Sequence, residues 1–491
     1  MLAIIISSIS RRTYNERTMS ATEGPREAAA TDAGERLKRS ALIVCTAGAF
    51  LTPYMGSSLN VALPFIGRDL GAGAILLSWV TSSFMLAAAV FLLPAGRFAD
   101  IHGRKRVFMY GIILYTFASF LASLAWSAPA LIAIRVIQGS GGAMMFGANV
   151  AILTAVFPPG ERGRVLGINV ASVYLGNSVG PFVGGLLTQH AGWRSIFMVN
   201  VPIGLFLFWL LSKRLPGEWA GAKGERFDYA GSGVFGLSMI ALMLGFTYLP
   251  AGRGAILSLA GVLGFSAFLA LEWRTEHPVL NVRVLSVNRV FMFSSLAALA
   301  NYCATAGTVF LLSLYLQYVK GLPPSRAGMV LLIQPLVQTG VAPFAGRLSD
   351  RIEPRVVSSI GMLSTAAGLL MLATLGETTP IPFIAASLVL LGVGFGTFSS
   401  PNTNAVMSSV DRSLYGVASA TLGTMRLTGQ ILSMGIVTVL LAVHVGHAVI
   451  TAALHPRFLA CARSSFMAFA LLCLLGVFAS LARGRIRTRV V

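Results

Sequence analysis

The feature that most constrains this chain is a series of fourteen apolar runs, each close to the length of a membrane-spanning helix. A helix of about 20 apolar residues crosses the hydrocarbon core of a bilayer. A membrane β-barrel would instead alternate apolar and polar residues over strands of about 10 residues, and these runs show no such alternation. The sequence therefore predicts an all-α polytopic membrane protein with helices near 41–63, 75–96, 107–126, 130–157, 165–188, 195–212, 228–249, 255–272, 290–316, 327–346, 356–375, 381–404, 416–443 and 463–482.

Composition excludes a water-soluble fold. Of the 491 residues, 55% are hydrophobic and 11% are charged, whereas soluble domains carry roughly 25% charged residues. The four cysteines show no metal-binding spacing, and no nucleotide-binding signature is present. We therefore expect no metal, no cofactor and no catalytic residues.

Lysine and arginine are distributed unequally between the two predicted faces. The face that holds both termini carries 28 of them and the other face carries 7. Because cytoplasmic loops are enriched in these residues, both termini are expected in the cytoplasm, and the protein in the plasma membrane. The same distribution accounts for the net charge of +20, so that nucleic-acid binding is not expected.

The chain divides into five predicted segments. Residues 1–40 are expected to form a disordered cytoplasmic tail without a signal sequence, and Met19 is an alternative start. Residues 41–212 and 290–482 are predicted six-helix bundles, and residues 213–289 form a linker with two further transmembrane helices. Residues 483–491 are predicted to be a basic cytoplasmic tail.

A charged turn occurs twice and indicates an internal repeat. Residues 96–107 read GRFADIHGRKRV, and GRLSDRIEPRV begins at Gly346. Both turns lie on the predicted cytoplasmic face in the same orientation, which predicts two parallel six-helix halves. The second copy comes eight helices after the first, so that helices 7 and 8 must be inserted between halves formed by helices 1–6 and 9–14.

Six motifs in order make the chain resemble the major facilitator superfamily, in its fourteen-helix branch of drug:proton antiporters. They include the loop motif with Gly96, Asp100, Gly103, Arg104 and Lys105, LIAIRVIQGSGGA with Arg135 and Gln138, and GNSVGPFVGGLL with Gly176, Gly180, Pro181, Gly184 and Gly185. WRSIFMVNVPIG, FDYAG and MRLTGQ complete the series. The resemblance implies a monomeric exporter of small molecules, driven by proton exchange and alternating access.

The first charged turn is predicted to act as a gating latch. The Asp100 carboxylate can accept hydrogen bonds from Arg104 or from the N-terminus of a neighbouring helix, and would thereby hold the halves shut at the cytoplasmic face. Gly96 and Gly103 would permit close approach and a tight turn. The alternative is that these charges only orient the loop. The second copy keeps Asp350 and Arg351 but has Glu353-Pro354 next, so a structural role is expected there.

The fifth predicted helix repeats small residues at Gly176, Gly180 and Gly184, which places them on one face for close helix packing. Pro181 removes one backbone hydrogen bond and adds a bend. The resemblance implies that this motif accompanies export.

Two arginines, Arg135 and Arg426, are predicted inside helices. Arg426 lies roughly 15 Å into helix 13, near the midplane, where an arginine costs at least about 2.5–3.5 kcal/mol unless it faces a cavity or a polar partner. Each arginine is either a structural hydrogen-bond hub or a residue that responds to protonation elsewhere. Further candidates for coupling or for lining a cavity are Gln138, Asn60, Phe84 and Gln334.

Helix 1 departs from the family pattern. Met55 stands where this branch usually has an acidic residue, and no aspartate or glutamate is predicted near mid-membrane depth. Proton coupling would then use Asp100 or another acid at a helix end, and the cavity would favour neutral, zwitterionic or anionic amphiphiles. The alternative to a multidrug exporter is an exporter of one specific neutral, lipid-like or anionic metabolite. A membrane enzyme is not expected, because no catalytic constellation is present at membrane depth.

Overall fold

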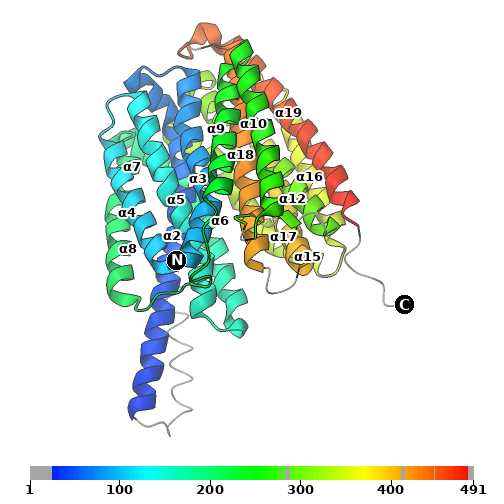
Figure 1. Cartoon of the computed structure of the whole chain (residues 1–491). Coiled ribbons are helices and arrows are strands. Elements are labelled where there is room, and N and C mark those ends of the chain that lie inside the picture. Colours follow the sequence, from blue (N-terminus) through cyan, green and yellow to red (C-terminus); the bar gives the residue numbers. More distant parts are fainter. Residues whose placement is uncertain are drawn as a thin grey trace.

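The computed structural model describes residues 25–276, 278–280, 282–283, 288–410, 415–446 and 448–484. Within these ranges the regular elements are helices, and fourteen helical spans are long and apolar enough to cross a membrane (Figure 1). The predicted fold class is therefore confirmed. We call the face at which the first span begins and the last span ends the terminal face, and the other the opposite face.

The first half consists of α2 (Pro25–Leu70), α3 (Ala74–His102), α4 (Arg104–Ser123), α5 (Ala128–Val156), α6 (Pro159–Ala191), the short α7 (Ser195–Met198) and α8 (Asn200–Arg214). Helix α2 packs along α6, and α5 packs against both α3 and α4. The expected disordered tail is wrong in part: α2 begins at Pro25, so residues 25–40 continue the first span as a helix. Residues 1–24 lie outside the described residues.

The second half consists of α12 (Arg289–Tyr302), α13 (Ala306–Leu314), the π-helix η1 (Tyr315–Val319), α14 (Pro324–Leu331), α15 (Ile333–Ser349), α16 (Pro354–Leu372), α17 (Ile381–Ser408), α18 (Tyr415–His444), the 3-10 turn η3 (Ala452–Leu454) and α19 (His455–Ala482). Two predicted spans are thus interrupted, near Cys303 and at Leu332.

The predicted basic tail also needs a correction at its first residue. Arg483 is only 1% exposed and donates hydrogen bonds to Ser294 Oγ, Asn402 Oδ1 and Ser358 Oγ. It therefore joins α12, α17 and α16 in the core of the second half. Residues 485–491 lie outside the described part of the chain.

The inserted helices α9 (Tyr229–Tyr248) and α10 (Gly252–Arg274) form a hairpin at the junction of the two halves (Figure 1). They pack on each other, and α9 also packs on α3 of the first half and α18 of the second. The start of α9 is fixed by Asp228, whose carboxylate accepts a hydrogen bond from Gly231 N, as an N-cap does.

Candidate functional site

The charged turn between α3 and α4 is built on Gly103, whose φ of +119° favours glycine. Across this turn Arg104 Nε donates to Asp100 Oδ1 at 2.8 Å, and Arg104 Nη1 donates to the Ala151 carbonyl at 3.1 Å. The predicted Asp100–Arg104 contact is therefore present, and it fastens α3 and α4 to α5 within the first half.

Acidic residues of the linker between α8 and α9 complete the turn. The Glu218 carboxylate accepts hydrogen bonds from the backbone amides of Lys105 at 2.8 Å and Arg106 at 3.2 Å, at the positive N-terminus of α4. Glu225 forms an ion pair with Arg97 at 2.5 Å. These partners are not apparent from the sequence. They connect the turn to the linker of the inserted hairpin, and closure of the two halves through Asp100 stays a prediction.

Gly96 needs a correction. A Cβ added at Gly96 would point into open space, so the close approach predicted here does not depend on glycine at position 96. The close approach comes from Gly147 on α5, where a Cβ would stand 3.1 Å from the Gly96 backbone nitrogen.

The second copy of the charged turn has different partners. Asp350 Oδ1 accepts a hydrogen bond from Asn404 Nδ2 at 3.4 Å. The position four residues after Asp350, which corresponds to Arg104 in the first copy, is occupied by Pro354. An ion pair of the first type cannot form there, and Arg351 is exposed.

The small residues of α6 serve two interfaces. A Cβ on Gly176 would stand 2.5 Å from the Phe50 carbonyl, and side chains on Gly180 and Gly184 would likewise overlap with α2. On another side of α6, a Cβ on Gly185 would stand 2.5 Å from the Pro324 carbonyl, and the Pro181 carbonyl lies against Gly328. The motif therefore lets α6 contact both α2 and α14 of the second half.

The two halves are joined near the opposite face by two hydrogen bonds, one of which uses a carbonyl left free by Pro64. Proline has no N–H, so Pro64 leaves the Asn60 carbonyl of α2 without its usual helical donor. Ser313 Oγ from α13 donates to that carbonyl at 2.5 Å, and Gln317 Nε2 from η1, which continues α13, donates to the Val61 carbonyl at 2.9 Å. Both donors are buried and come from the second half. We call these two hydrogen bonds the α2–α13 clasp.

Further contacts lie on the same side of the molecule. Ser78 Oγ and Thr438 Oγ1 are 3.0 Å apart between α3 and α18. Ser325 Oγ donates to Gln189 Oε1 at 2.5 Å between α14 and α6. These contacts and the clasp hold the halves together near the opposite face.

A polar cluster lies deeper between the halves. Tyr174 of α6 and Tyr302 of α12 place their hydroxyls 3.3 Å and 3.5 Å from Ser399 Oγ of α17. The two tyrosines and Ser399 were not predicted from the sequence, because they lie in separate helices and converge only in the folded structure.

Arg426 reaches across the same interface. Its guanidinium carbon lies 4.9 Å from the centroid of the Phe146 ring on α5, a distance typical of a cation–π contact. Among the ion pairs of the described residues, none involves Arg426. The half-buried arginine therefore presents a cation between the halves with an aromatic ring as its neighbour.

Arg135 is a hub within the first half. It is 1% exposed, donates to the Val80 carbonyl at 3.3 Å and to Gln138 Oε1 at 2.6 Å, and lies 4.3 Å from the Phe84 ring centroid. Gln138 Nε2 in turn donates to Ser119 Oγ at 2.8 Å. These contacts connect α5 to α3 and α4, which favours the hub interpretation of Arg135.

Met55 fills the place where an acid was expected. It is fully buried, and its sulfur accepts a hydrogen bond from Asn200 Nδ2 at 3.2 Å. The candidates Asn60 and Gln334 are also buried, at 6% and 7% exposure. The described His, Cys, Asp and Glu residues do not gather in a group of three that could hold a metal ion.

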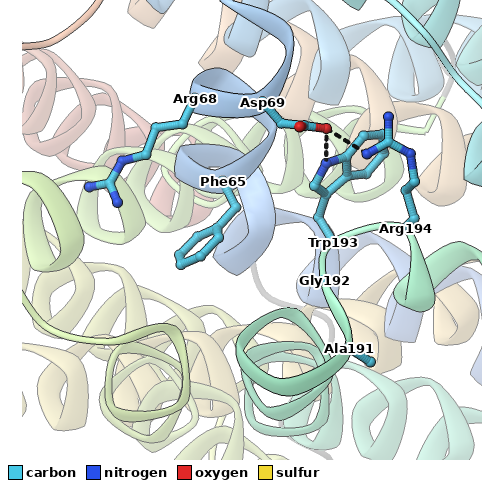
Figure 2. Close-up of a pocket in the computed structure, with 7 residues that line it drawn as sticks. All are labelled: Phe65, Arg68, Asp69, Ala191, Gly192, Trp193 and Arg194. Carbon is cyan, nitrogen blue, oxygen red and sulfur yellow. Dashed lines mark hydrogen bonds and ion pairs between the residues drawn. The ribbon is translucent and has the colours of Figure 1, made fainter.

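The residues that line a surface pocket at the opposite face form hydrogen bonds with one another (Figure 2). Asp69 at the end of α2 accepts hydrogen bonds from Trp193 Nε1 at 2.9 Å and from Arg194 Nη1 at 2.5 Å. Arg194 also donates to the Ala125 carbonyl. These bonds fasten the loop between α6 and α7 to α2, so that the pocket is part of the framework of the first half.

Residues 45–434 and 294–489 match the Major Facilitator Superfamily. The riboflavin transporter RibZ of Clostridioides difficile is 30% identical and aligns with 78% of this chain and 84% of its own length. The tetracenomycin C resistance and export protein of Streptomyces glaucescens is 30% identical, over 82% and 76% of the two chains. The multidrug resistance protein Stp of Mycobacterium tuberculosis is 31% identical, over 82% and 75%. The crystal structure of a bacterial homologue of the human lysosomal transporter Spinster, inward-facing and unoccupied, has the same fold, with a TM-score of 0.69, 17% identity and coverage of 91% and 97%.

Proposed function

The chain belongs to the major facilitator superfamily of secondary transporters, and we propose that it exports amphipathic small molecules across the plasma membrane in exchange for protons. Among its relatives are proteins named for antibiotic resistance and export and for multidrug resistance. The proposed mechanism is alternating access, in which the first half rocks against the second.

The α2–α13 clasp is the observation that carries this proposal. It closes the halves near the opposite face, while the Tyr174–Ser399 cluster and Arg426 lie between them at greater depth. The positive-inside distribution supports a cytoplasmic terminal face. In that orientation the structure is closed to the outside, which is the state in which an exporter loads its substrate from the cytoplasm.

We assign gating of the terminal face to the turn at Asp100 and Arg104. Its contacts with Glu218 must rearrange if α3, α4 and α5 move relative to the linker, and its contact with the Ala151 carbonyl must rearrange if α4 moves relative to α5. Asp350 and Arg351 keep a structural role in this scheme.

The side chains between the halves support a substrate without net positive charge. Arg426 contributes a cation, and Tyr174 and Tyr302 contribute hydroxyls and aromatic surface. Within the first half, Met55 takes the place of an acid that would attract a cation. Neutral, zwitterionic or anionic amphiphiles with planar rings fit this chemistry best.

A second candidate is an exporter of one specific neutral, lipid-like or anionic metabolite. The observation that favours it is the buried contact between Met55 and Asn200, which leaves the usual helix 1 acid site without a carboxylate. A narrow substrate range would distinguish this candidate from multidrug export.

The experiment that tests this proposal measures proton movement in everted membrane vesicles that contain the protein. Respiration acidifies the interior, and dequenching of a fluorescent pH probe reports proton release when cationic, neutral or anionic amphiphiles are added. We expect dequenching with neutral or anionic compounds and its loss in Asp100→Asn and Arg426→Ala, but not in Arg457→Ala, an exposed arginine near the opposite face. A response to one compound would select the second candidate. Absence of any response from folded protein would refute proton exchange.

A further inference from the structure

Two carboxyl groups meet where the inserted hairpin reaches the terminal face. Asp228 caps α9, and its Oδ1 accepts a hydrogen bond from Gly231 N at 2.8 Å. Glu272, near the end of α10, is 1% exposed, and its Oε2 accepts a hydrogen bond from Leu280 N at 2.8 Å. One oxygen of each carboxyl group is therefore held by a backbone amide.

The other two oxygens face each other. Asp228 Oδ2 and Glu272 Oε1 are both buried and have no hydrogen-bond partner. A Cβ added at Gly231 would overlap with both atoms, so that the two oxygens share the space left by the missing side chain. Glycine at this position allows the two carboxyl groups to approach.

Positive charges do not neutralise this pair. None of the ion pairs that the described residues form involves Asp228 or Glu272. Arg283 Nε donates to the Trp273 backbone carbonyl, and Arg226 and Arg274 are exposed.

The helices packed against α9 direct their charges elsewhere. On α3, Arg97 pairs with Glu225 of the linker, Asp100 pairs with Arg104, and the His102 ring stacks on Phe98. On α18, Arg426 lies over the Phe146 ring. The acid pair is thus left with two acceptor atoms and no donor between them.

Two buried carboxylates in contact repel each other and cost free energy, whereas a single proton between them turns one acceptor into a donor. We propose that Asp228 and Glu272 hold one proton between them and form a proton-binding site on the inserted hairpin. The site lies on the inserted hairpin and belongs to neither six-helix half.

The linker gives this site a connection to the charged turn. Asp228 ends the segment in which Glu218 and Glu225 bind the amides of α4 and the side chain of Arg97. Loss of the proton would separate Asp228 from Glu272 and disturb the start of α9 together with this segment. The use of the site in transport rests on the proposed function, but proton binding does not.

The first test is the pH dependence of stability in detergent, which needs no substrate. At pH values above the ordinary carboxyl range, the folded pair would still hold one proton, whereas the unfolded chain would already have released it. The unfolding equilibrium constant should then rise with pH, by up to about tenfold per unit. In Glu272→Gln the amide can donate to Asp228 and still accept from Leu280 N, so this dependence should be lost. Asp228→Asn should act likewise, because asparagine also caps helices.

Glu276→Gln is the matched control, since Glu276 is an exposed acid four residues away. It should keep the wild-type pH profile. A wild-type profile in both Glu272→Gln and Asp228→Asn would overturn the proposal.

Infrared spectroscopy provides a second readout. The wild-type protein should show a protonated carboxylic acid carbonyl band at neutral pH that shifts in deuterated water and is absent in Glu272→Gln. An unchanged band in folded Glu272→Gln and Asp228→Asn would exclude the shared proton.

Discussion

The α2–α13 clasp gives a prediction whose magnitude follows from two hydrogen bonds. Ser313→Ala removes the donor to the Asn60 carbonyl, and Gln317→Leu removes the donor to the Val61 carbonyl. Each hydrogen bond contributes about 1 kcal/mol, so the double variant should destabilise closure of the opposite face by about 2 kcal/mol. That value corresponds to a shift of roughly 30-fold in the equilibrium between closed and open opposite faces.

Spin labels attached to cysteines at Leu124 and Thr378 would measure this shift. Both positions are exposed at the opposite face, one in each half, whereas the four native cysteines are buried. The distance distribution should move toward longer distances in the double variant.

The matched control is Ser387→Ala. Ser387 is also a fully buried serine, but its hydroxyl donates to the Phe383 carbonyl within α17. It should leave the distances unchanged. If the Ser313→Ala/Gln317→Leu protein is folded and has the wild-type distribution, the assignment of the clasp as the closure of this face is wrong.

Three further predictions concern glycines and Met55. Gly180→Val should destabilise the protein by about 1–3 kcal/mol through overlap with α2, and should lower its melting temperature in detergent, whereas Gly167→Val, which has open space around it, should not. Gly103→Ala should cost about 1–2 kcal/mol because of its positive φ, and Gly96→Ala should be close to neutral in the same assay; equal losses would refute the difference between these two motif glycines. Met55→Asp should extend transport toward cationic compounds in the vesicle assay. An unchanged substrate range would show that residue 55 does not determine the charge of the substrate.

The membrane spans could be predicted from the sequence because the thickness of the bilayer sets the length of each apolar run. The positive φ of Gly103 and the Asp100–Arg104 contact were likewise predictable, since both depend on residues within one turn. The continuation of α2 back to Pro25 was missed because those residues are polar. Hydropathy identifies the part of a helix that crosses the bilayer, but not a polar extension of the same helix.

Contacts between distant segments could not be predicted. Glu218 is separated by 113 residues from Lys105, and a linker without a periodic pattern gives no indication of where its acids bind. Arg483 looked like part of a basic tail because its three polar partners come from three other helices. Burial of a charge depends on the packing of several helices, which one segment does not reveal.

The hairpin of α9 and α10 has a mechanical consequence. Because α9 packs on both α3 and α18 (Figure 1), it bridges two helices that belong to different halves. Any rotation of one half against the other must therefore shear at least one of these two contacts. The packing of the hairpin against both halves therefore opposes their relative rotation. A twelve-helix transporter without this insertion would lack this resistance.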